Sequence, residues 1–396
     1  MRRTAVLGIS TAIFCFLTWT AQAQVFSVVH AFQGPPDGAN PMAGFIRDSA
    51  GNLYATTDGG GAYGWGTVFK VNASGQETVL YSFTGGNDGG HPTATLVRDS
   101  SGNLYGTAQS GGKLNWGTVF KLNSAGKLTV LHTFTGGKDG GTPRAGLIRD
   151  SSGNLYGTTS AGGAACLASP GCGVIFKLTS AGTETVLHTF TGSDGAMPAA
   201  ALIRDSAGNL YGTTTTGGNL ACGTDGPYGC GTVFKLSASG TYTVLHKFNG
   251  GSDGMAPSAP VIRDSSGTLY GTTTEGGSSC SCGIVFALSS SGKETILYSF
   301  KGGSDGSFPQ AGLVRDASGN LYGTTEYGGA GYGTVFQISP TQQETVLHVF
   351  DYNTDGAYPL SNLVRDSAGN LYGTTSNNGP STCNQYGCGT VFEVAP

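Results

Sequence analysis

Short strand-like runs of apolar and β-branched residues recur along the chain, and a turn separates each run from the next. In the third copy of the pattern they cover residues 145–149, 155–159, 173–178 and 185–190. We name these runs strands A, B, C and D in chain order. None has helical periodicity or helical length, so the pattern predicts an all-β protein.

The hairpin between strands A and B carries one repeated motif, Arg-Asp-Ser-x-Gly-Asn-Leu-Tyr-Gly-Thr-Thr. Its most regular copy spans residues 149–159, and the other six begin at Arg47, Arg98, Arg204, Arg263, Arg315 and Arg365. Successive copies lie 50 to 59 residues apart. Four strands in about fifty residues are typical of a propeller blade, so seven copies predict a seven-bladed β-propeller with four antiparallel strands per blade. A parallel β-helix would use shorter coils without such hairpin turns.

The two ends of the chain predict how the ring closes. Residues 26–32 match strand D, whereas residues 389–394 match strand C. The last blade therefore lacks its fourth strand, and the N-terminal strand is expected to join it, since an open ring would leave unpaired edges. Strand A carries small residues and is placed innermost. The D–A and B–C loops then share one face of the ring.

The first 23 residues read as a signal peptide: Arg2 and Arg3 precede an apolar stretch that ends in Ala21-Gln22-Ala23. We expect residues 24–396 to form one propeller domain, a monomer that is secreted or periplasmic and leaves the membrane after cleavage. Without Arg2 and Arg3 the chain has 18 basic and 24 acidic side chains, a net charge of −6. That balance argues against nucleic acid as a partner.

The repeated hairpin motif, followed by Gly-Thr-Val-Phe-Lys and Glu-Thr-Val-Leu-His-Thr-Phe, resembles the GloVer tandem-repeat proteins of bacterial cell envelopes. The resemblance covers essentially all of residues 26–394. It implies an exported bacterial protein and carries no assigned biochemical activity. Members commonly end in a sorting or anchoring segment. This chain ends at Pro396, which favours release over surface anchoring.

Eight cysteines of the expected mature chain fall into four local pairs within B–C loops. An even number of cysteines behind a signal peptide predicts disulfides. The pairs are Cys166/Cys172, Cys222/Cys230, Cys280/Cys282 and Cys383/Cys388, of which the third has only one intervening residue. The second cysteine of each pair precedes strand C, where other blades have Trp65, Trp116 or Tyr332. Each blade therefore fills this place with an aromatic ring or a cysteine pair.

Other polar residues also follow the repeat. The loops between strands D and A contain Asp-Gly-x-x-Pro, with the aspartates expected around the axis: Asp37, Asp88, Asp139, Asp194, Asp253, Asp305 and Asp355. They would form a cation site or cap their own turns, and their sevenfold equivalence favours capping. Five histidines share one strand D register, which tyrosine fills in two blades. They lie too far apart to share a metal and are expected to pack, so no metal site is predicted.

The B–C loops depart most from the repeat and gather aromatic residues suited to stacking on a ligand. The candidates are Tyr63, Trp65, Trp116, Tyr228, Tyr327, Tyr332 and Tyr386. Two hypotheses follow: a non-catalytic binding or scaffold protein that takes a polysaccharide or protein ligand on this face, or a lyase or glycan-active hydrolase at the axial funnel. Strand A looks uniform across the blades, which favours the binding protein. We identify no catalytic residue and expect no cofactor.

Overall fold

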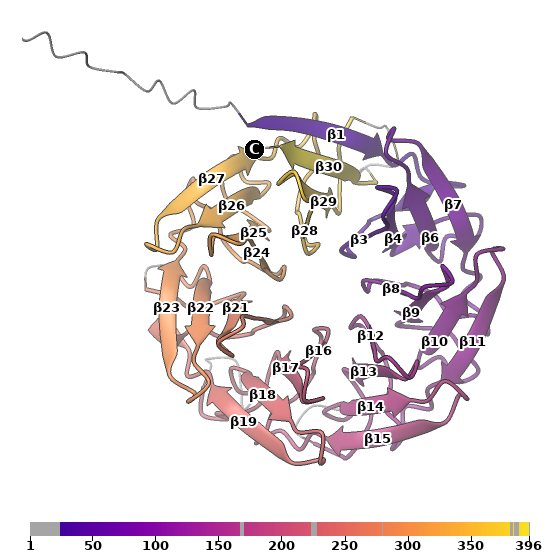
Figure 1. Cartoon of the computed structure of the whole chain (residues 1–396), viewed down its shortest axis with the longest axis horizontal. Helices are drawn as coiled ribbons and strands as arrows, with labels where there is room; N and C mark the ends of the chain where they lie inside the picture. The colour runs from indigo at the N-terminus through magenta and orange to yellow at the C-terminus, as the bar shows by residue number, and fades with distance from the viewer. Residues whose placement is uncertain are drawn as a thin grey trace, which may run out of the picture.

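The computed structural model describes residues 24–166, 170–222, 228–278, 280–380, 383 and 388–395. These residues form seven four-stranded antiparallel sheets arranged as blades around a central axis (Figure 1). The predicted seven-bladed propeller is confirmed. Within the described ranges the only helix is the single turn η1 (Gly251–Asp253), so no helix there is long and apolar enough to cross a membrane.

Each blade runs outward from strand A to strand D. The innermost strands, A, are β3 (Ile46–Arg47), β8 (Val97–Arg98), β12 (Ile148–Arg149), β16 (Ile203–Arg204), β20 (Ile262–Arg263), β24 (Val314–Arg315) and β28 (Val364–Arg365). The B strands are β4 (Leu53–Thr57), β9 (Leu104–Ala108), β13 (Leu155–Thr159), β17 (Leu210–Thr214), β21 (Leu269–Thr273), β25 (Leu321–Thr325) and β29 (Leu371–Thr375).

The two outer positions hold longer ladders. The C strands are β6 (Thr67–Val71), β10 (Thr118–Leu122), β14 (Val174–Leu178), β18 (Thr232–Leu236), β22 (Ile284–Leu288), β26 (Thr334–Ile338) and β30 (Thr390–Ala395). The D strands are β7 (Glu77–Ser82), β11 (Leu128–Thr133), β15 (Glu184–Thr189), β19 (Tyr242–Lys247), β23 (Glu294–Ser299), β27 (Glu344–Val349) and β1 (Val25–Ala31). A short extra pair joins β2 (Gly38–Ala39) to β5 (Gly59–Gly60).

Strand A is shorter than the sequence pattern predicts. In the third blade only Ile148 and Arg149 pair with strand B, whereas Ala145 and Gly146 line a cavity on the axis. The preceding Pro143 has no N–H for a ladder hydrogen bond, and the blades converge too closely at the axis for a wider sheet. The prediction that small side chains lie next to the axis is thus correct, but these residues lie outside the sheet.

The ring closes through the N-terminal strand. Strand β1 pairs antiparallel with β30, from Val25 opposite Ala395 to Ala31 opposite Thr390. The seventh blade thus has the order β1-β30-β29-β28, with one strand from the start of the chain and three from the end. In Figure 1, β1 lies along the outside of β30. The predicted closure is confirmed.

Phenylalanine pairs join each blade to the next. The first pair places Phe32, which follows β1, edge to face on Phe69 of β6, with ring centroids 5.1 Å apart. Corresponding contacts of 5.0 to 5.5 Å recur at the other six junctions. Glycine in strand B makes room for the ring: a Cβ built on Gly157 would lie 2.7 Å from Phe176. Burying one such side chain stabilises the fold by roughly 1.5–3 kcal/mol.

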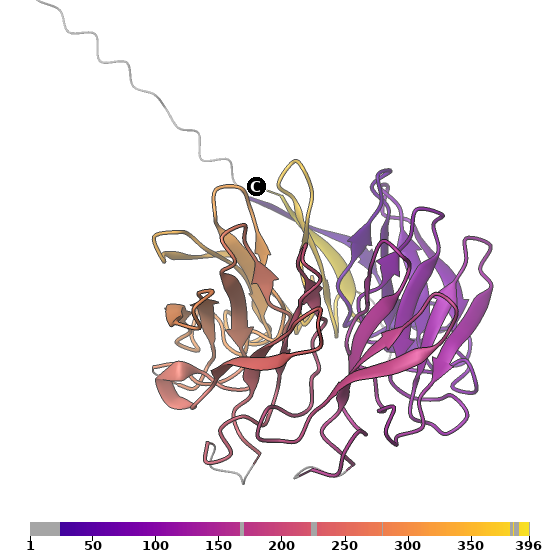
Figure 2. The same cartoon turned by 60° about the horizontal axis from the view of Figure 1, so that its bottom comes forward.

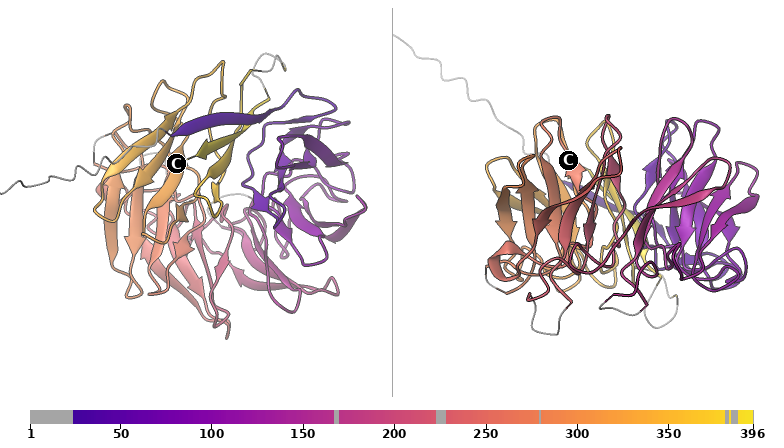
Figure 3. Two further views of the ribbon diagram at one scale, coloured as in Figure 1. Left: turned by 45° about the horizontal axis from the view of Figure 1, so that its top comes forward. Right: turned by 90° about the horizontal axis from the view of Figure 1, so that it is seen from below.

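The described parts of the D–A and B–C loops lie on one face of the ring. Each D–A loop pairs with the B–C loop of the blade that it enters, as in the bridge between Gly90 and Ser110 and its equivalents in other blades. Figures 2 and 3 show these loops on one side of the ring and the A–B and C–D hairpins on the other. We call the first side the loop face. The predicted distribution of loops is correct.

Deleting residues 24–32 should destabilise the protein by about 5 kcal/mol, because roughly 1.5–3 kcal/mol is lost for each apolar side chain no longer buried. Phe32 is fully buried, while Phe26 and Val29 pack against their neighbours' clusters. Urea unfolding followed by circular dichroism measures the change, with a chain that begins at Gln24 as the control. Equal unfolding midpoints would contradict closure by β1.

Candidate functional site

The repeated hairpin motif makes contacts between neighbouring blades on the face opposite the loops. In the first blade, Asp48 accepts hydrogen bonds from the backbone N–H of Asn52 at 2.9 Å and the hydroxyl of Tyr54 at 3.0 Å. Burial alone would raise the pKa of Asp48, but these bonds hold it below its usual value. The Arg98 guanidinium of the next blade lies 5.6 Å from the Tyr54 ring centroid. Equivalent arginine–tyrosine contacts recur at five further junctions, so the motif is structural.

Aromatic rings and disulfides occupy the same place before strand C. The Trp65 indole covers Gly85 so closely that a Cβ there would lie 2.3 Å from it, and Trp116 covers Gly136 in the same way. In three other blades the sulfurs of a cystine approach the equivalent glycine. The two tryptophans therefore pack as plugs on the neighbouring loop, and Trp65 keeps 40% of its surface exposed.

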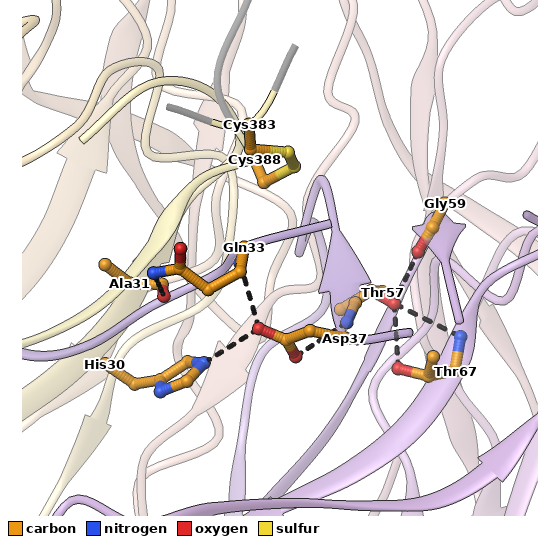
Figure 4. Close-up of polar contacts among 10 residues, drawn as sticks. His30, Ala31, Gln33, Asp37, Thr57, Gly59, Thr67, Cys383 and Cys388 are labelled. Carbon is orange, nitrogen blue, oxygen red and sulfur yellow. Dashed lines mark hydrogen bonds and ion pairs between the residues drawn. A yellow bond between two sulfur atoms is a disulfide. The ribbon is translucent and has the colours of Figure 1, made fainter. Parts of the chain in front are cut away.

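All four predicted disulfides are present, including the one with a single intervening residue (Cys383–Cys388 is drawn in Figure 4). They join Cys166 to Cys172, Cys222 to Cys230, Cys280 to Cys282 and Cys383 to Cys388. Each bond closes a short loop between strands B and C on the loop face.

The second cysteine of each pair lies just before strand C, as predicted, and is a core residue. Cys172, Cys230 and Cys282 are only 0%, 3% and 6% exposed, and each belongs to a hydrophobic cluster that two neighbouring blades share. The position directly before strand C packs against the adjacent blade, as Trp116 does in the second blade. These three cysteines therefore contribute buried apolar contacts and no accessible binding surface.

The repeated aspartates of the D–A loops turn away from the axis. Asp37 accepts a hydrogen bond from the Gln33 N–H at 2.9 Å and lies 3.3 Å from Nε2 of His30 in the outermost strand (Figure 4). The histidine or tyrosine of strand D faces the aspartate in the other six blades as well. The expected carboxylate ring around the axis is therefore wrong, because each carboxylate caps its own turn at the rim.

The first residue of the next D strand adds a third group to each of these rim junctions. It is glutamate at four of them: Glu77, Glu184, Glu294 and Glu344. Burial and the nearby aspartate raise the pKa of Glu77 to about 7 and that of Glu294 to about 8. At the other three junctions the residue near the start of the D strand is Leu128, Tyr242 or Phe26, and the Tyr242 ring stacks on His188 with the ring centroids 3.8 Å apart. The D-strand histidines therefore belong to polar contacts between blades as well as to packing.

A cavity of about 120 Å³ lies on the axis at the loop face. Alanine and glycine form much of its wall, and Arg144 is the one charged residue among the described residues that line it. The residue after each loop proline differs from blade to blade: Met42, Thr93, Arg144, Ala199, Ser258, Gln310 and Leu360. This position lies just before the run predicted as strand A, and its variation gives the cavity an asymmetric wall.

A cluster of five aromatic side chains surrounds the B–C loop of the sixth blade. Phe308 contacts Tyr327 at 5.8 Å, and Tyr327 contacts Tyr358 at 5.2 Å between ring centroids. Tyr332 then lies 6.4 Å from Tyr358 and 5.0 Å from Tyr352. Tyr327 is 40% exposed and the other four are half-buried. We call these five residues the aromatic cluster.

Polar groups connect the aromatic cluster to the axial cavity. Gln310, which lines the cavity, donates a hydrogen bond from its side-chain amide to Glu326. Burial raises the pKa of Glu326, and the charge of Glu326 in turn raises the pKa of its neighbour Tyr327. The surface thus offers ring faces, a carboxyl group and an amide side by side. These are the groups that bind the faces and hydroxyls of a sugar.

The sequence repeat and the structure agree with one known family. The model of the Gloeobacter/Verrucomicrobia repeat matches residues 13–225 and 221–396. The chain belongs to the Gloeobacter/Verrucomicrobia repeat family. The resemblance drawn from the hairpin motif is therefore confirmed. No curated protein matches the sequence of this Gloeobacter/Verrucomicrobia repeat protein.

Two solved structures share the fold of this Gloeobacter/Verrucomicrobia repeat protein. They are the extracellular domains of proteins named as a hybrid two-component system and a one-component system, both from B. thetaiotaomicron. The two domains are 14% and 12% identical to the chain, cover 91% and 93% of it, and each superposes with a TM-score of 0.57. The chain spans only 39% and 40% of their length, and likeness at this identity shows the fold alone.

The structure gathers only part of the predicted aromatic set of this repeat protein. Tyr327 and Tyr332 belong to the aromatic cluster, whereas Tyr63 (62% exposed) and Tyr228 (52% exposed) project from other blades. Trp65 and Trp116 are plugs, and Tyr386 lies outside the described residues. The sequence analysis missed three members, Phe308, Tyr352 and Tyr358. Phe308 and Tyr358 directly precede loop prolines, and Tyr352 stands where other blades have glycine, so departures from the D–A loop consensus could have revealed them.

Replacing Glu77 by glutamine should raise stability at pH 8 and leave it unchanged at pH 4. The fold raises this pKa from 4.5 to about 7, so the stabilising protonated form is complete below pH 4.5 and is lost as the pH rises through 7. We expect a gain on the order of 1 kcal/mol at pH 8, reduced by solvent because the side chain is half-buried. Urea unfolding at both pH values measures it, with Glu275→Gln as the control for charge. A gain of the same size at pH 4 would contradict the assignment.

Proposed function

We propose that this protein is an exported, non-catalytic binding propeller that takes a polysaccharide on its loop face, across the aromatic cluster. The observation that carries the proposal is the contiguity of Phe308, Tyr327, Tyr332, Tyr352 and Tyr358 around one blade of an otherwise regular ring. A ligand recognised at one blade needs such asymmetry, because seven equal positions define no single site.

The chemistry of the surface supports a sugar ligand. Aromatic rings bind the apolar faces of sugar rings, and the Tyr327 ring is accessible to solvent at 40% of its surface. The Glu326 carboxyl and the Gln310 amide lie beside it and can exchange hydrogen bonds with hydroxyl groups. The neighbouring axial cavity, with Arg144 in its wall, gives room for an acidic substituent.

The residue types favour binding over hydrolysis. Glycoside hydrolysis uses two carboxyl groups on either side of the scissile bond. Among the described residues that line the axial cavity none is acidic, and Glu326 is the one carboxyl group that hydrogen-bonds to that lining. Four disulfides support an oxidising compartment such as the periplasm or the exterior, as the predicted signal peptide does.

Tyr327→Ala and Tyr358→Ala should each weaken polysaccharide binding about tenfold, because each removes a ring worth roughly 1–1.5 kcal/mol of stacking. A panel of neutral and acidic plant and bacterial polysaccharides is screened first by affinity gel electrophoresis. Isothermal titration calorimetry with the best ligand then measures the loss. Tyr63→Ala is the matched control, since it removes an exposed tyrosine from the same face outside the aromatic cluster.

Three outcomes would overturn the proposal. The first is that no polysaccharide in the gel slows the wild-type protein. The second is that Tyr63→Ala loses as much binding affinity as the two cluster variants. The third is that incubation with a polysaccharide releases new reducing ends or unsaturated products. The last would identify an enzyme at the axial funnel, and Glu326→Gln would then be the first variant to test for lost turnover.

A further inference from the structure

One rim junction brings together three groups that ligate metals. His246 lies in β19 and Glu294 in β23, the outermost strands of the fourth and fifth blades, and Asp253 ends η1 in the loop between them. One donor atom from each of the three lies within 4.8 Å of the other two. We propose that His246, Asp253 and Glu294 bind one zinc ion that links the fourth blade to the fifth.

The distances fit a small tetrahedral ion. His246 Nε2 lies 3.3 Å from Asp253 Oδ1 and 3.9 Å from Glu294 Oε2. Ligands about 2.0–2.1 Å from a tetrahedral zinc stand roughly 3.4 Å apart, so the distance from His246 to Asp253 already fits and Glu294 must move closer to the other two ligands. One imidazole and two carboxylates form a ligand set that suits zinc better than calcium or magnesium, which prefer oxygen alone.

Two of these groups carry buried atoms that lack a hydrogen-bond partner. They are Nε2 of His246 and Oε1 of Glu294. Nε2 of His246 lies 3.3 Å from Oδ1 of Asp253 but does not form a hydrogen bond with it. A buried polar atom without a partner costs about 1–3 kcal/mol, and a bound cation would give Nε2 of His246 the partner that it lacks. The three side chains are only 12% to 22% exposed, so an ion there would have few water ligands.

Asn249 distinguishes this junction from its counterparts. Its backbone N–H and its side-chain amide both donate to Oδ2 of Asp253, at 2.7 and 3.0 Å, which leaves Oδ1 turned toward His246. The junction with Glu184 has the same three residue types, but there Oδ2 of Asp139, the oxygen that faces His132, accepts the backbone N–H of Thr135 at 2.9 Å, and the Thr135 hydroxyl donates to Oδ1. The aspartate oxygen that faces a ligand site is therefore free of other donors at the Asn249 junction.

The charge balance also favours a cation. The carboxyl groups of Asp253 and Glu294 both lie beside the His246 imidazole in a poorly solvated place, so a divalent cation would offset their charge. The cysteines of the expected mature chain offer no rival thiolate, since all eight are paired in disulfides.

Other junctions supply conservative variants that remove one ligand each. His246→Tyr copies the contact in which the Tyr81 hydroxyl donates to Asp88 at 2.9 Å. Glu294→Tyr copies the stacking of Tyr242 on His188. Both replacements already exist at equivalent places in this ring, so they should fold. Glu184→Tyr is the matched control, because it makes the same change at the junction that Thr135 blocks.

The test is titration of the untagged, disulfide-bonded chain, first freed of metal by a chelator, with zinc chloride. Isothermal titration calorimetry should show one zinc per chain, with affinity lowered at least tenfold in His246→Tyr and in Glu294→Tyr and unchanged in Glu184→Tyr. Zinc should raise the melting temperature of the wild type and of Glu184→Tyr but not of the two ligand variants. Failure of zinc to bind the wild type would overturn the proposal, as would unchanged binding in both ligand variants or equally tight binding of calcium.

Discussion

The edge-to-face contact between a phenylalanine after strand D and a phenylalanine in the next strand C is the constraint on which the ring depends. It recurs at all seven junctions, with centroids 5.0 to 5.5 Å apart. The contact sets the spacing of the blades and thereby requires small residues in strand B and at the axis. The arginine–tyrosine contacts on one face and the histidine–aspartate contacts at the rim fasten blades whose separation these rings already determine.

The sequence predicted the architecture because its signals are local and occur seven times. The spacing of the hairpin motif indicated the number of blades, and the unmatched D-like segment around His30 indicated the closure that β1 makes. Three disulfides followed from short cysteine spacings and an even count, and the fourth, between Cys280 and Cys282, is present although its single intervening residue argued against it. Strand A was predicted too long, because small residues near the axis look like a continuing strand although their backbone leaves the ladder there.

The candidate sites were harder to predict because their residues come from different repeats. Tyr358 and Tyr327 meet only because two loops of neighbouring blades fold onto each other, and the φ of 59° at Tyr358 turns its side chain from the direction an extended loop would give. His246 and Glu294 lie 48 positions apart and share a junction only in the closed ring. The sequence analysis compared His246 only with the equivalent residues of the other D strands, and it therefore predicted a packing role alone.

The rim junctions also bear on how seven similar blades assemble in the right order. Repeat arrays with interchangeable interfaces misassemble readily, because a blade can pair with the wrong neighbour at little cost. Here the third group differs around the ring: Glu77 meets His30 and Asp37, Tyr242 stacks on His188, and Phe26 stacks on His348. Exchanging two blades would place a glutamate beside a histidine that now stacks on an aromatic ring, or would leave such a histidine without its stacking partner. The residue near the start of strand D thus makes some junctions chemically different from others, which disfavours contacts between blades that are not neighbours.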